Sequence, residues 1–212
     1  MRAKEGDVLP TPIDKRYEAV LYHERSWAKD VSFAAMRPKP LTVWEVVIPV
    51  FIIFNHMRLK GAREVFAQNL LFTKKLALDA ALAMTKNGQS KPDAMSHLEE
   101  KTKALLASVE DGIYSEQIRQ KQLEEIHLLM DHYCRLLQAE GKDYATLVAH
   151  AYNSLNRYKS FLEELKEAEG EVNRAAVKTL GHQADTETLS KIEAASHHMR
   201  LETARKIFQT IH

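Results

Sequence analysis

The chain has 212 residues, of which 45% are hydrophobic and 28% are charged, a composition typical of a globular protein and not of a disordered one. The single cysteine, Cys134, excludes an internal disulfide and a cysteine-rich zinc module, and it fits a reducing compartment. The net charge is +1, but residues 1–75 carry 13 Lys and Arg against 8 Asp and Glu, whereas residues 76–212 carry 17 against 21. This asymmetry favours an anionic partner for the N-terminal part, although differences of this size also arise as ordinary variation along a chain.

The first 36 residues are predicted to form a polar tail followed by one helix. Residues 1–15 lack the apolar core of a secretory signal, so we expect a cytoplasmic location or attachment to a membrane from the cytosolic side. The helix is expected to begin near Asp14 and to end before Pro38 and Pro40, because two prolines at alternate positions cannot continue a helix.

The most apolar stretch of the chain runs from Val43 to Phe54, where ten of twelve side chains are hydrophobic. As a helix these residues would span about 18 Å, less than the ~30 Å of a bilayer core. Three interpretations stay open: a marginal membrane crossing, a segment lying on a membrane surface, or a helix buried in a core or in an interface. The residues that would contact a membrane or partner are Trp44, Pro49, Phe51, Phe54, Arg58, Lys60 and Arg63.

Two helices are predicted next. The first begins near Gly61 and ends at Asn87-Gly88, a pair typical of a helix C-terminus. The second begins after Ser90, a predicted N-cap, has Pro92 in its first turn, and runs to about residue 112.

The clearest pattern predicts a long antiparallel helical hairpin over about 114–180. Its first arm carries apolar residues at spacings of 3 and 4, and a turn at 139–143 separates it from a second arm with a similar pattern. Helices joined by so short a turn fold back on each other. The two predicted seams are Leu123, Ile126, Met130, Tyr133 and Leu137, and Tyr144, Val148, Ala151, Leu155, Tyr158, Leu162 and Leu165.

A last helix is expected from about Leu189 to Ile211, after a break at 181–188. No pair of strands is predicted, because the only β-branched run, within 43–54, has no second strand beside it. The predicted fold class is therefore all-α, an irregular helical bundle built on the long hairpin. We expect three parts: a tail and first helix (1–36), an apolar and basic helical segment (37–88), and a bundle with a coiled-coil-like hairpin (89–212).

One group of side chains suggests a metal site. Glu124 and His127 form a Glu-x-x-His pair, the spacing that di-iron bundles use, and Asp131 lies one turn further along. These residues lie one position out of phase with the apolar seam, which indicates a solvated face. The chain also lacks a glycine-rich phosphate loop, a serine elbow and a CxxC pair.

The sequence thus favours a non-catalytic interaction protein over an enzyme. The predicted partner of the 37–75 region is a protein or an anionic membrane surface, with a homo-oligomer as a further possibility and with neither nucleic acid nor a cofactor expected. The alternative is a helical metal-binding protein or enzyme that uses Glu124, His127 and Asp131.

Overall fold

A computed structural model describes residues 10–35, 62–107, 114–181 and 186–210. These residues form seven helices and contain no strand, so the protein belongs to the all-α class, as the sequence predicts. The helices are α1 (Pro12–Ala35), α2 (Ala62–Asn87), α3 (Lys91–Ala107), α4 (Glu116–Gln138), α5 (Tyr144–Tyr152), α6 (Leu155–Leu180) and α7 (Thr186–Thr210).

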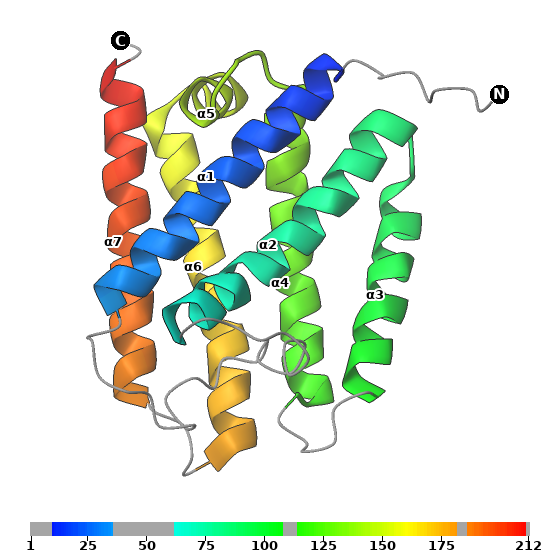
Figure 1. Cartoon of the computed structure of the whole chain (residues 1–212), viewed down its shortest axis with the longest axis vertical. Helices are drawn as coiled ribbons and strands as arrows, with labels where there is room; N and C mark the ends of the chain where they lie inside the picture. The colour runs from blue at the N-terminus through cyan, green and yellow to red at the C-terminus, as the bar shows by residue number, and fades with distance from the viewer. Residues whose placement is uncertain (1–9, 36–61, 108–113, 182–185, 211–212) are drawn as a thin grey trace, which may run out of the picture.

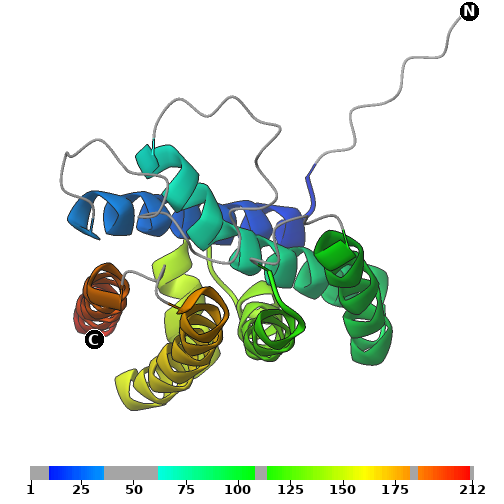
Figure 2. The same ribbon diagram turned by 90° about the horizontal axis from the view of Figure 1, so that it is seen from below.

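The helices pack in two layers. In Figure 1, α3, α4, α6 and α7 stand side by side, while α1 and α2 run diagonally across them in opposite directions. Figure 2 shows α1 and α2 as one layer above the others. α4 lies at the centre, in contact with α1, α2, α3, α5 and α6. The described residues of the three predicted parts, 1–36, 37–88 and 89–212, therefore contribute to one hydrophobic core.

Polar caps fix where several helices begin. The Ser90 hydroxyl accepts a hydrogen bond from the Asp93 N–H (3.2 Å), and Ser115 accepts one from Ile118 (3.3 Å) at the start of α4. Asp143 and Thr146 form a reciprocal capping box at the start of α5. Such caps satisfy N–H groups that lack a partner within the helix.

The predicted hairpin needs a correction in its second arm, which is two helices and not one. α5 ends at Tyr152, and Asn153 adopts the left-handed conformation with φ of 59°. Asparagine tolerates this conformation better than most residues, and the next residue, Ser154, caps α6 by accepting a hydrogen bond from Arg157 (3.4 Å). A left-handed residue followed by an N-cap therefore interrupts a continuous apolar pattern.

The buried face of α4 is wider than one predicted seam. Ile126, Met130, Tyr133 and Leu137 are fully buried, but Leu123 is only half-buried. In the second arm Leu162 is buried and Leu155 is partly buried against the same core. Because α4 has neighbours on several sides, its apolar stripe is broader than that of a two-helix hairpin.

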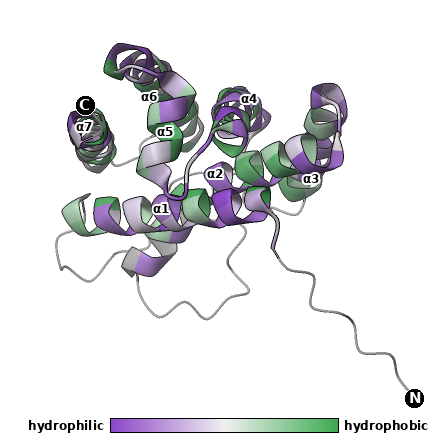
Figure 3. Cartoon of the chain, turned by 90° about the horizontal axis from the view of Figure 1, so that it is seen from above, coloured by the Kyte–Doolittle hydropathy of each residue, from purple (hydrophilic) through white to green (hydrophobic). Residues whose placement is uncertain are grey.

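Among the helices of the described ranges, none combines the length and the hydrophobicity that a membrane crossing requires. Figure 3 shows hydrophilic and hydrophobic residues alternating along these helices, as in amphipathic helices that share a core. The apolar stretch 43–54 lies outside the described residues.

Candidate functional site

A second seam on α4 carries polar residues into the core. It consists of Ile118, Gln122, Glu125, Leu129, His132 and Leu136, at spacings of 4, 3, 4, 3 and 4, and every one of these side chains is buried. Half of its members are polar, and for this reason the hydrophobic pattern of the sequence did not reveal it. The regular spacing was the signal that could have found it.

An ion-paired group lies at the centre of the bundle. Arg200 on α7 donates two hydrogen bonds of 2.6 Å to the carboxylate of Glu169 on α6. Lys74 on α2 approaches the same carboxylate at 3.4 Å. Lys74 and Arg200 are buried, as are Glu24 on α1 and Glu125 on α4. These five ionisable residues together with Trp27 and His132 are called the polar cluster below.

Trp27 lies against the two cations of the polar cluster. The Arg200 guanidinium lies 4.3 Å from the centroid of the indole ring, and Lys74 Nζ lies 4.7 Å from it. Cations over an indole face are attracted by the ring quadrupole, and the attraction grows when water is excluded. Trp27 thereby connects α1 with α2 and α7.

The carboxyl groups of the polar cluster differ in their proton affinity. Burial alone would raise the pKa of Glu169, but Arg200 and Lys74 outweigh it and lower this pKa to about 2. Burial and the neighbouring Glu169 carboxylate raise the pKa of Glu125 to about 8. Glu169 is therefore the charged partner of the two cations, whereas Glu125 retains its proton at neutral pH.

Further imidazole and phenol groups lie beside the polar cluster. A hydrogen bond of 2.7 Å joins His132 Nδ1 to the Tyr152 hydroxyl, and one of 2.9 Å joins the hydroxyls of Tyr144 and Tyr158. The His23 ring stacks on Tyr144, with ring centroids 3.4 Å apart. Burial lowers the pKa of both His23 and His132, so these rings are neutral hydrogen-bonding groups at neutral pH.

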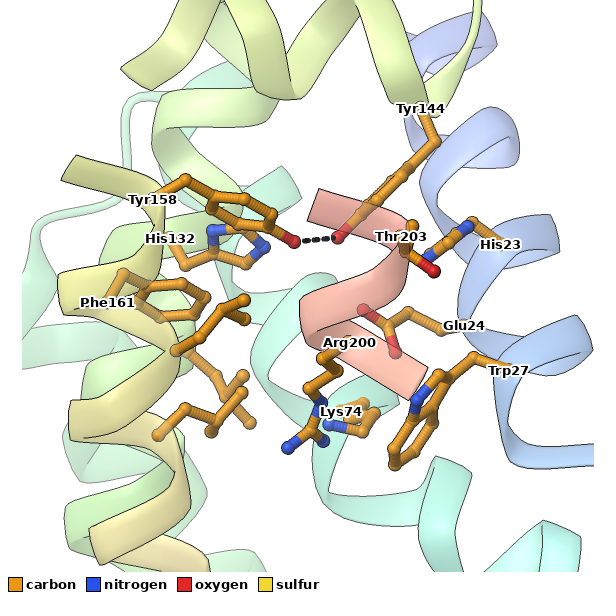
Figure 4. A pocket seen from close by; sticks show the side chains of 13 residues that line it. His23, Glu24, Trp27, Lys74, His132, Tyr144, Tyr158, Phe161, Arg200 and Thr203 are labelled. Atoms are coloured by element: carbon orange, nitrogen blue, oxygen red, sulfur yellow. Dashed lines mark hydrogen bonds between the residues drawn. The ribbon is translucent and has the colours of Figure 1, made fainter. Parts of the chain in front are cut away.

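A small cavity lies between these groups. Figure 4 shows side chains from α1, α2, α4, α5, α6 and α7 converging on it. The space open to the centre of a water molecule is about 20 Å³, whereas pockets for organic ligands measure about 300–1,000 Å³. The cavity is therefore much smaller than a pocket for an organic ligand.

The predicted metal residues lie on the outer surface between α3 and α4. Glu124 and His127 are exposed; Glu124 pairs with Lys121 (2.9 Å), and Asp131 pairs with Lys91 (2.6 Å). All three line an open groove of about 390 Å³ beside Met95, Leu123 and Leu128. In the described part of the chain, no three His, Cys, Asp or Glu side chains come close enough together to hold a metal ion.

Most of the predicted docking residues lie outside the described ranges, namely Trp44, Pro49, Phe51, Phe54, Arg58 and Lys60. Arg63 falls in the first turn of α2. Further along α2, Lys74 belongs to the polar cluster, and Lys75 pairs with Asp79 at 2.6 Å. Lys74 and Lys75 therefore have acidic partners within the bundle.

The protein is thus an all-α helical bundle whose interior holds ion-paired side chains around a cavity of the size of a water molecule. Comparisons with models of protein families, with curated proteins and with solved structures gave no match.

Proposed function

We propose that the protein is a non-catalytic helical interaction protein that docks to an anionic membrane surface through the 37–75 region. The observation that carries the proposal is the continuous core that the seven described helices bury among themselves. A bundle with such a core is a stable support for a segment inserted between two of its helices. The most apolar stretch of the chain, residues 43–54, falls in the interval between α1 and α2.

The chemistry of this interval suits a membrane surface better than a protein partner. Arg37 and Lys39 precede the apolar stretch, and Arg58, Lys60 and Arg63 follow it. Each basic residue near an anionic leaflet contributes about 1 kcal/mol, and apolar and aromatic side chains between basic flanks are typical of segments that lie at the interface. The small volume at the centre of the polar cluster also favours docking over catalysis.

Co-sedimentation with lipid vesicles tests the proposal. We expect the full chain to pellet with vesicles that contain phosphatidylserine and to bind pure phosphatidylcholine far more weakly. Five basic residues at about 1 kcal/mol each correspond to a difference of up to several thousandfold in affinity. Binding should weaken as salt is added, because the screening length shortens to about 3 Å at 1 M.

A pair of matched variants locates the contact. Phe51→Glu should abolish binding and leave the bundle folded, whereas Tyr22→Glu should leave binding unchanged, since Tyr22 is 76% exposed on α1. If Phe51→Glu unfolds the protein, residues 43–54 are core and the proposal fails. It also fails if Phe51→Glu binds as tightly as the unmodified chain.

A further inference from the structure

The cavity in the polar cluster has a mixed wall, with apolar side chains of α4 and α6 on one part of it and polar groups on the rest. The side chains of His23, Glu24, Trp27, Lys74 and Arg200 line one part of it, and Figure 4 shows how they lie relative to one another. The side chains of His132, Tyr144 and Tyr158 line another part of the wall. Water occupies buried cavities of this kind when several polar partners surround it, whereas apolar cavities of similar size stay dry.

The volume limits the occupant to one small molecule. About 20 Å³ is open to the centre of a water molecule, and a single water needs about 10–15 Å³ on this measure. The space is thus that of about one water molecule and is far too small for an organic molecule.

One donor in the wall has no partner. Trp27 is only 6% exposed, and its Nε1–H makes no hydrogen bond within the described part of the chain. Figure 4 shows the indole nitrogen turned towards the carboxylate of Glu24, one turn earlier on α1. An unpartnered buried donor destabilises the folded state, and a bridging acceptor would remove that cost.

We propose that this cavity is a binding site for one water molecule, which accepts a hydrogen bond from Trp27 Nε1–H and donates one to the Glu24 carboxylate. The water completes the polar cluster by joining two α1 side chains that the protein alone leaves apart.

The surrounding charges select a neutral occupant. The Arg200 guanidinium is already held by Glu169 through two hydrogen bonds of 2.6 Å, and Lys74 lies 3.4 Å from the same carboxylate. An anion would also meet the Glu24 carboxylate in the wall. A metal cation would need several His, Cys, Asp or Glu ligands, and the described residues contain no such group.

The chain has two tryptophans, Trp27 and Trp44, so a Trp44→Phe variant leaves one indole N–H to observe. In its proton NMR spectrum we expect a nuclear Overhauser cross-peak between the Trp27 indole N–H and water. Its sign should be the one that a water molecule bound for a long time gives, and not that of freely exchanging solvent. The Trp27→Phe variant is the matched control and should lose this cross-peak. Absence of the cross-peak in the Trp44→Phe variant would overturn the proposal.

A crystal structure of the full chain, soaked in sodium bromide, provides the second arm of the test. We expect one density peak of a water molecule between Trp27 Nε1 and Glu24, without an anomalous bromide signal. A bromide signal in the cavity would show that it binds anions. A direct hydrogen bond between Trp27 and Glu24 would show that no water is needed. Either result contradicts the proposal.

Discussion

Replacing Arg200 by methionine should strongly destabilise the bundle. Methionine fills a similar space but removes two charge-assisted hydrogen bonds of 2.6 Å to Glu169 and the cation above Trp27. The Glu169 side chain is 23% exposed, so its carboxylate would stay largely buried with Lys74 as its remaining cation at 3.4 Å. Breaking a buried pair by removing one partner costs about 3–5 kcal/mol, and we expect Arg200→Met to fall in this range.

Arg174→Met is the matched control. Arg174 pairs with Glu167 and Glu171 at the same 2.6 Å, but its side chain is 58% exposed. Exposed pairs are worth about 0–1 kcal/mol, so this change should hardly alter stability. Urea unfolding followed by circular dichroism measures both costs. Adding Glu169→Met to Arg200→Met should recover little of the loss, because Lys74 is then buried without its carboxylate partner. A cost for Arg200→Met as small as that for Arg174→Met would refute the reasoning.

Three further predictions concern single positions. The pKa of Glu125 is raised from 4.5 to about 8 in the folded state, so its contribution to the free energy of unfolding is full below pH 4.5 and is lost as the pH rises towards 8. Glu125→Gln should remove this fall in stability, as measured by urea unfolding between pH 4.5 and 8. Asn153→Ala should lower stability by about 1–2 kcal/mol, since φ is 59°, while Asn153→Gly should be tolerated in thermal melts. Replacing Glu124 and His127 by Gln should change stability by less than about 1 kcal/mol. If a chelator destabilises the unmodified protein but not this double variant, these residues bind a metal ion.

The helices could be predicted from the sequence because their signals are local. Ser90, Ser115 and Asp143 are good N-caps, and each stands directly before a helix in the structure. The break between α5 and α6 was missed because Tyr144, Val148, Leu155 and Tyr158 keep the same spacing on both sides of it. Asn153-Ser154 is a weak signal inside a strong apolar pattern.

The polar cluster could not be predicted because its members come from helices far apart in the chain. Trp27, Lys74, Glu125, Glu169 and Arg200 lie on five different helices, and only packing brings them together. Sequence patterns treat buried charges as surface residues, since such charges are almost never buried unless they are paired. Lys74, for example, belongs to the basic residues 1–75, whose charge favoured an anionic partner, but it is 3% exposed.

The emission of Trp44 tests the proposed docking most directly, because this residue lies within the apolar stretch. In a Trp27→Phe variant, Trp44 is the single tryptophan, and circular dichroism checks that the bundle is folded. With phosphatidylserine vesicles, we expect its emission to shift to shorter wavelength and to be quenched by brominated acyl chains, with both effects reversed by salt. Emission that stays unchanged and unquenched when vesicles are added would contradict the proposed membrane contact.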